Sequence, residues 1–235
     1  MDGIRIQTPL LSLPALILAA LACGLPGPAG PSPTPGPPAT PAVFLPPEWT
    51  PTPGPPVPEV PADWQEFQAG RVHLWLPGSF EGGNVDTELP KVVEALRMLG
   101  AEYVDMAEYL EQNPGVFVLW VVDTVPGPSG GLANVNVTKE DVPETVSLQE
   151  YLDASVDLLP SDFEVVDQGI VTLGDREVGK LVLSVVSASL RRMSVVYVFR
   201  DGARFWNVTY ASDAGEFVER TPTWETSIHS FWLEG

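Results

Sequence analysis

Cysteine and histidine are nearly missing from this chain. It holds one cysteine, Cys23, and two histidines, His73 and His229, in 235 residues. A single thiol excludes an internal disulfide, so a folded domain must be stabilised by packing alone. No C-x-x-C or H-E-x-x-H spacing is present, and a zinc site would therefore need carboxylates to complete it. The sequence predicts no metal and no cofactor.

Basic residues are also scarce. Twelve Lys and Arg stand against 31 Asp and Glu, which gives a formal net charge of −19. A surface of this sign repels nucleic acids and anionic lipid headgroups, and it favours cations, basic proteins or solubility. Nucleic acid is therefore excluded as an expected partner.

Long hydrophobic runs are absent apart from residues 10–21, which are too few for a spanning helix of roughly 20 apolar residues. The run ends in Ala-Leu-Ala-Cys-Gly at residues 20–24, which resembles the bacterial lipobox. The resemblance implies a leader over residues 1–22, a diacylglyceryl group on Cys23, and a lipid anchor at the outer face of the cell membrane. Ala20 and Ala22 also satisfy the small-residue rule of ordinary signal peptidase, so a secreted product without lipid and an uncleaved anchor stay open.

Proline is concentrated in one region. Sixteen of the chain's 26 prolines lie between residues 24 and 62. Such a segment favours polyproline II and excludes helices and sheet ladders. We expect residues 23–62 to be a linker that carries a domain away from the membrane. Phe44, Leu45 and Trp49 interrupt the prolines and either dock on the domain, bind a partner or have no role.

Residues 63–235 are long enough for one domain with its own core. Period-two patterns and apolar runs predict strands over residues 71–76, 116–122, 132–138, 163–173, 177–187, 192–199 and 204–211. We expect the second and third to form a hairpin with a long loop, and the last four to form an antiparallel meander.

Helical periodicity marks three further regions. It predicts two short helices, or one kinked at Gly100, over residues 89–110, and a helix over 148–159 with a capping box at Ser147 and Glu150. A closing helix is expected to start at Thr221 and Pro222, with Trp224, Ile228 and Phe231 on its buried side. Strands interleaved with segregated helices indicate the α+β class.

Five segments resemble the PsbP-like family, which includes the photosystem II extrinsic protein, Mog-type Ran-binding factors and DcrB-like lipoproteins. They are RVHLWLP (71–77), SLQEY (147–151), Gly174 with EVGKLVLSVV (177–186), YVFRDGARFWNVTYAS (197–212) and TWETSIHSF (223–231). The resemblance covers most of residues 67–235 and implies a curved antiparallel sheet flanked by helices, without a catalytic signature. No position matches the plant protein's photosystem-binding or ion-binding residues, so photosynthetic function is not implied.

One motif would suit an enzyme. Residues 127–131 satisfy G-x-S-x-G around Ser129, with His229 downstream as a possible base. A nucleophile elbow needs a strand before the serine and a helix after it, yet the pattern from Leu132 onward is that of a strand. We therefore expect an ordinary loop here and no enzymatic activity.

Acidic clusters offer a second route to chemistry. Glu140 and Asp141 with Glu144, or Glu108 with Glu111, supply the oxygen ligands that a hard cation such as calcium prefers. Solvated surface faces are the simpler interpretation. His73 is expected to be a half-exposed strand residue, and His229 to lie at the edge of the closing helix.

Tryptophans and two repeated triplets suggest glycans. Trp75 and Trp206 lie on predicted strands, and one of them would face outward and stack on a sugar. The triplets Asn-Val-Thr at 136–138 and 207–209 match glycosylation sequons, but both lie in predicted strands and a bacterial lipoprotein would not use them in the eukaryotic way.

These patterns predict a lipid-anchored domain that binds or assembles with a protein or glycan outside the membrane. The rival interpretation is an extracytoplasmic hydrolase or metal-dependent enzyme that uses Ser129 or an acidic cluster. A third is a passive spacer or envelope-stress protein.

Overall fold

The computed structural model describes residues 60–99, 104–112, 115–128, 131–186 and 191–235. All strand pairs are antiparallel, and they form a sheet of three strands in the order β1-β2-β10 and a sheet of seven in the order β3-β4-β5-β9-β8-β7-β6. The strands are β1 (Trp64–Ala69), β2 (Val72–Pro77), β3 (Phe80–Asn84), β4 (Phe117–Asp123), β5 (Asn134–Asp141), β6 (Phe163–Leu173), β7 (Arg176–Val186), β8 (Arg191–Asp201), β9 (Arg204–Asp213) and β10 (Trp232–Leu233). The helices are α2 (Val85–Leu99), α3 (Val104–Gln112), α4 (Leu148–Asp157) and α5 (Phe217–His229).

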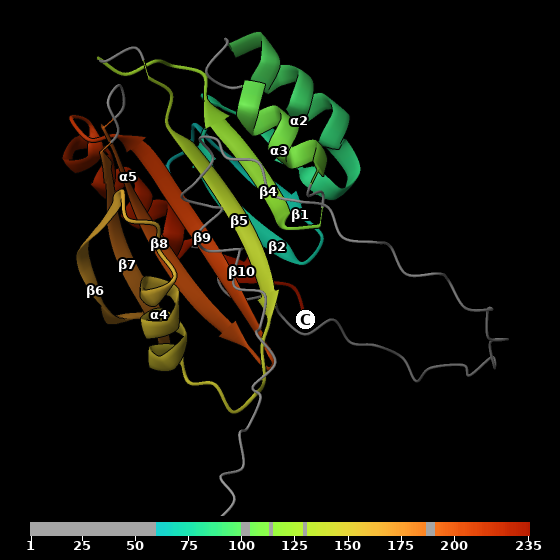
Figure 1. The fold of residues 1–235 in the computed structure, drawn as a ribbon. Helices are drawn as coiled ribbons and strands as arrows, with labels where there is room; N and C mark the ends of the chain where they lie inside the picture. Colours follow the sequence, from blue (N-terminus) through green and yellow to red (C-terminus); the bar gives the residue numbers. More distant parts are fainter. Residues whose placement is uncertain (1–59, 100–103, 113–114, 129–130, 187–190) are drawn as a thin grey trace, which may run out of the picture.

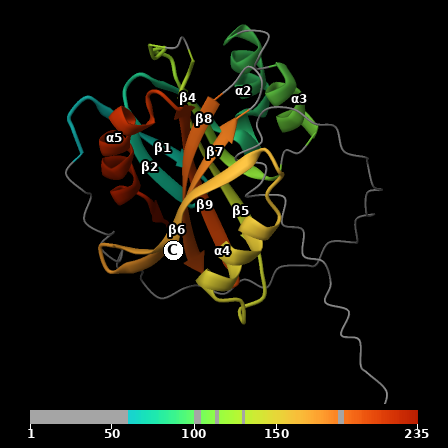
Figure 2. The ribbon, with the colours of Figure 1, turned by 60° about the vertical axis from the view of Figure 1, so that its left-hand side comes forward.

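The main hydrophobic core lies between the two sheets. We call the face of the seven-stranded sheet that contacts this core the inner face; the small sheet and α5 cover it (Figures 1 and 2). Alternate residues of each strand enter the core, as Val135 and Val137 of β5 and Val208 and Tyr210 of β9 show, all with no exposed surface. Period-two alternation in the sequence thus becomes one continuous apolar layer.

The opposite, outer face of the seven-stranded sheet carries two separate helical layers. Helices α2 and α3 pack on β4 around Phe117 and Trp120, and α4 packs on β6 and β7 through Tyr151 and Leu152. Figure 1 shows β5 and β9 passing between these two helical layers. The centre of the outer face is therefore flanked by helices on both sides.

The structure confirms the α+β class and most of the predicted elements. The expected hairpin is β4 with β5, the meander runs β6-β7-β8-β9, and the helical region before them is two helices. The capping box is present: the Glu150 amide donates to the Ser147 hydroxyl at 3.2 Å, and the Ser147 amide donates to the Glu150 carboxylate at 2.8 Å. None of the described helices is long and apolar enough to cross a membrane.

The predicted start of the closing helix was wrong. Helix α5 begins at Phe217, so Pro222 lies inside it, and the buried Phe231 follows its end. The first turn is held by Arg220, which donates to Asp123 at 2.7 Å and to Glu216 at 2.9 Å. These ion pairs tie the first turn of α5 to Asp123 at the end of β4.

Three strands were not predicted: β1, β3 and β10. β10 has only two residues, and β3 contains Gly82 and Gly83, which break any apolar alternation. Gly82 has a φ of +130°, and a Cβ there would overlap the Trp120 carbonyl oxygen. Backbone proximity to β4, rather than strand propensity, therefore selects glycine at this position.

Candidate binding surface

Two candidates from the sequence, Cys23 and Ser129, lie outside the described residues, so lipidation and the serine nucleophile stay predictions. The segment that follows Ser129 leads into the strand β5 and not into a helix. His229 is the exposed last residue of α5, as expected. A nucleophile elbow needs a helix after the serine. The first described residues after Ser129 do not form one.

The acidic candidates do not converge on one point. Glu140 is 7% exposed and bonds to Tyr151, whereas its neighbour Asp141 is exposed and accepts from Arg204 at 2.6 Å. That contact lowers the pKa of Asp141. In the other pair, Glu111 accepts from Arg97 at 2.8 Å.

Among the described residues, no group of three or more histidine, cysteine, aspartate or glutamate side chains is placed to hold a metal ion. His73 is buried at 6% exposure, which corrects the expectation of a half-exposed residue. It stacks on Trp232 at 3.8 Å between ring centroids, and its Nδ1 lies 2.8 Å from Glu66 Oε1. The strand β10, which the sequence did not predict, is the element that covers it.

The two tryptophans proposed as sugar platforms differ in burial. Trp206 is 3% exposed and belongs to the main core, so it is not a platform for a sugar. Trp75 keeps intermediate exposure. Neither tryptophan lies on the outer face of the seven-stranded sheet.

The two Asn-Val-Thr triplets pair with each other. In the register of β5 and β9, Asn136 is opposite Thr209, Val137 opposite Val208, and Thr138 opposite Asn207. Directly opposite residues on one face of an antiparallel pair have Cβ atoms about 4.5–5.5 Å apart. The two valines therefore enter the core together, and the four polar side chains form one group on the outer face.

We call the outer-face polar residues of these two strands the polar stripe. It consists of Asn134, Asn136, Thr138 and Glu140 of β5 and Asn207 and Thr209 of β9. Each is at most 7% exposed, and four of the six have no exposed surface. The stripe lies where β5 and β9 pass between the helical layers (Figure 1).

One end of the polar stripe is hydrogen-bonded. Asn207 Nδ2 donates to the Tyr151 hydroxyl at 2.9 Å, and that hydroxyl donates to Glu140 Oε2 at 3.0 Å. Burial raises the pKa of Glu140, although the Tyr151 hydrogen bond acts in the opposite direction. Burial, with the Glu140 carboxylate next to it, also raises the pKa of Tyr151, so this hydroxyl remains a proton donor.

The middle of the polar stripe has polar atoms without partners. Both amide atoms of Asn136, the Thr209 hydroxyl, Asn207 Oδ1 and Glu140 Oε1 are buried and form no hydrogen bond. The same holds for Nε1 of Trp120, which is directly opposite Asn136 on β4. A buried polar atom without a partner typically destabilises a fold by about 1–3 kcal/mol. These unpartnered atoms lie in one row across neighbouring strands, which makes the polar stripe the candidate binding surface.

Sequence reasoning missed this surface, although a signal was present. The repeated triplets were considered only as glycosylation sequons. To predict that the triplets pair, one must know that β5 and β9, which are distant in sequence, are neighbours in the sheet.

Comparison with known proteins gives only distant similarities. No protein-family model and no curated protein matches the chain. Cyanobacterial PsbP (CyanoP) from Synechocystis is 13% identical with a TM-score of 0.48, and the match covers 74% of this chain and 95% of that one. The Ran-binding protein Mog1p of Saccharomyces cerevisiae is 10% identical with a TM-score of 0.45, covering 72% and 95%.

A third similar structure is LpqN of Mycobacterium tuberculosis, described as involved in cell envelope biogenesis. It is 14% identical with a TM-score of 0.44, and the match covers 70% of this chain and 83% of that one. PsbP and Mog proteins are thus among the similar structures and also in the family that the sequence resembles. The α+β assignment itself follows from the strand order and pairing.

Proposed function

We propose that this protein is a non-catalytic binding module, held at the outer face of the cell membrane by a lipid on Cys23. The lipobox-like residues 20–24 and the proline-rich residues 24–62 support the anchor and the spacer. The structured residues then form the part that meets a ligand outside the membrane.

The observation that carries the proposal is the set of unpartnered polar atoms in the polar stripe. Asn136 and Thr209 lie on central strands of a seven-stranded sheet, so their positions are rigid. Rigid placement of polar groups that the fold itself does not use lowers the ordering cost of binding. Because Asn136 and Thr209 have no exposed surface, a ligand reaches them only if the polar stripe opens on binding, and it then supplies the missing hydrogen bonds.

The polar stripe also limits the ligand's chemistry. Asn136 and Thr209 both donate and accept hydrogen bonds, and Trp120 donates. The one ionisable stripe residue, Glu140, has a raised pKa, and the chain carries a net charge of −19. We therefore propose an uncharged ligand surface with mixed donors and acceptors, such as a glycan or the main chain of a protein, and no nucleic acid.

The test of binding is affinity capture from a cell-envelope extract with three versions of the full-length protein. The versions are wild type, Asn136→Leu combined with Thr209→Val, and the control Val218→Ser, which changes an 81% exposed residue on α5. We expect one component that wild type and control retain and the stripe variant loses. Equal retention by all three would contradict the polar stripe as the binding surface.

Three further measurements test the anchor and the absence of catalysis. Mass spectrometry of the mature N-terminus should find a diacylated Cys23, and globomycin should block its processing. Labelling by a serine-directed fluorophosphonate that disappears in Ser129→Ala would instead support a hydrolase.

A further inference from the structure

Strand β6 is an unusually long edge. It is the last strand in the order of the seven-stranded sheet and has 11 residues, against five in β3 at the opposite edge. Soluble proteins usually keep edge strands short or covered, because an edge presents unpaired backbone N–H and C=O groups. Figure 2 shows β6 at the margin of the sheet.

The edge is only partly protected. A register shift between Val165 and Asp167 interrupts the β6–β7 ladder, and such bulges discourage pairing. From Asp167 to Leu173, however, the register with β7 is unbroken. Seven residues at the C-terminal half of β6 therefore keep the regular geometry that an added strand requires.

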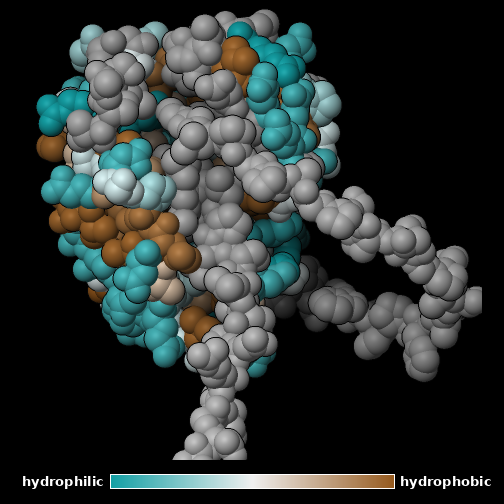
Figure 3. Space-filling model, viewed as in Figure 1, coloured by the Kyte–Doolittle hydropathy of each residue, from teal (hydrophilic) through white to brown (hydrophobic). Residues whose placement is uncertain are grey.

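Apolar side chains are exposed beside this edge. Val166 and Ile170 of β6 are 54% and 44% exposed, and Leu158 at the end of α4 is 46% exposed. These are three of the five large apolar side chains that are exposed among the described residues. In Figure 3 an apolar patch covers the surface next to α4, over the strands β6 and β7.

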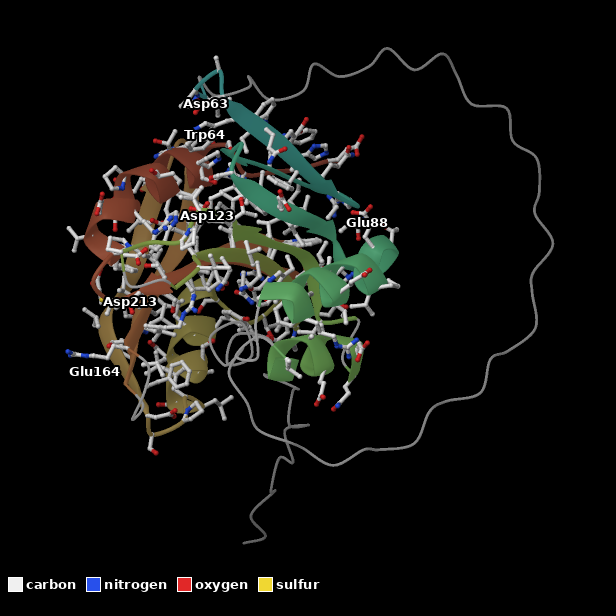
Figure 4. The ribbon with its side chains drawn as sticks, turned by 90° about the horizontal axis from the view of Figure 1, so that it is seen from above. Asp63, Trp64, Glu88, Asp123, Glu164 and Asp213 are labelled. Carbon is white, nitrogen blue, oxygen red and sulfur yellow. The ribbon has the colours of Figure 1, made fainter. Side chains whose placement is uncertain are left out.

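Acidic side chains lie beside the apolar ones on β6. Glu164 is exposed and lies at the periphery of the molecule in Figure 4. The carboxylate of Asp167 is 59% exposed and pairs with Lys180 across 3.4 Å. A docking strand would therefore meet both apolar groups and negative charge.

We propose that β6 binds an extended segment of a partner protein in which apolar residues alternate with lysine or arginine, and that this segment adds to the sheet as an eighth strand. Main-chain hydrogen bonds give such docking its affinity, and alternate side chains give it specificity. Within the regular segment, a basic residue would meet Asp167 and an apolar one Ile170, while Val166 lies at the register shift and Glu164 just before it. A second copy of this chain is disfavoured, since each copy has a net charge of −19.

The test uses full-length protein in mild detergent and a fluorescein-labelled peptide of ten residues in which valine alternates with lysine. Fluorescence anisotropy should show saturable binding. Ile170→Lys places a like charge against the peptide and should weaken binding about tenfold. The matched control Val218→Lys, on α5, should leave affinity unchanged.

Two further experiments test the role of charge and the role of the peptide's backbone hydrogen bonds. Asp167→Lys should weaken the lysine peptide and strengthen a peptide in which valine alternates with glutamate. Methylation of alternate peptide nitrogens should abolish binding, because an added strand depends on N–H donors. Asn136→Leu should have no effect, so this result is independent of the polar stripe.

Several outcomes would overturn the proposal. They are equal affinity for the lysine and glutamate peptides, wild-type binding by a folded Ile170→Lys variant, undiminished binding of the methylated peptide, or absence of binding. Sedimentation that shows a dimer lost in Ile170→Lys would assign the edge to a second copy instead.

Discussion

The two faces of β5 and β9 are built from the same strands and differ in chemistry. On the inner face, Val135, Val137 and Val208 are fully buried in the main hydrophobic core. On the outer face, Asn136 and Thr209 are buried to the same degree but keep polar atoms without partners. Burial alone therefore does not tell which residues hold a fold together.

The difference between the faces separates stability from function. An apolar side chain gains from burial in proportion to the area removed from water. A polar side chain gains only if its hydrogen bonds are restored. We infer that the inner face stabilises the protein and that the polar stripe is retained for binding.

The largest expected effect is on the inner face. Trp224→Ala removes a 1% exposed indole that packs on Tyr210 and Phe217. We expect a loss of about 4 kcal/mol in the free energy of unfolding, from the lost burial and the cavity left behind. Urea denaturation measures it, and a loss below about 1 kcal/mol would show that α5 is not part of the core.

The next effect comes from making the inner face resemble the outer one. Val137→Asn places an amide among apolar side chains and removes a buried valine. We expect a loss of about 3 kcal/mol, because neither amide atom finds a partner. Urea denaturation of Thr138→Val, one residue along on the outer face, is the comparison. A similar loss in both variants would abolish the distinction between the faces.

A smaller effect is expected at the hydrogen-bonded end of the polar stripe. Tyr151→Phe removes the hydroxyl that joins Asn207 to Glu140. We expect a loss of about 2 kcal/mol in thermal or urea unfolding, since a buried amide and carboxylate lose a partner. Tyr197→Phe is the control, because its hydroxyl has no hydrogen bond within the described residues and its removal should cost under about 0.5 kcal/mol.

The smallest effect depends on pH. Burial raises the pKa of Glu140 in the folded protein above its unfolded value. The folded state therefore binds the proton more tightly, and stability is lost as pH rises through the folded pKa. Glu140→Gln removes this loss, so its stability relative to wild type should increase from pH 4 to pH 7. A stability of Glu140→Gln relative to wild type that stays constant or falls from pH 4 to pH 7 would contradict the raised pKa.

Much of the fold could be predicted from local patterns. The alternation from Val72 to Leu76 and the capping box at Ser147 each specify an element through residues that are close in sequence. Helix α5 shows the limit of such reasoning. Its first turn is held by Asp123, which lies 97 residues before Arg220, and no local pattern contains that contact.

The polar stripe could not be predicted in the same way. An Asn-Val-Thr triplet in one strand looks like an ordinary half-buried strand, with the polar residues in solvent. Only the pairing of β5 with β9 places Asn136 opposite Thr209, and both side chains are fully buried. The candidate site depends on which strands are neighbours in the sheet, whereas the inner core follows from the alternation of apolar residues along each strand.

The most direct test of the central claim is the free energy of unfolding of Asn136→Leu combined with Thr209→Val. Both changes remove unpartnered polar atoms and keep the number and branching of the side-chain heavy atoms. We expect the variant to be as stable as wild type or about 1–2 kcal/mol more stable, because buried polar atoms without partners destabilise the native state. A loss of about 2 kcal/mol or more would show that these groups support the fold, and would contradict their assignment to binding.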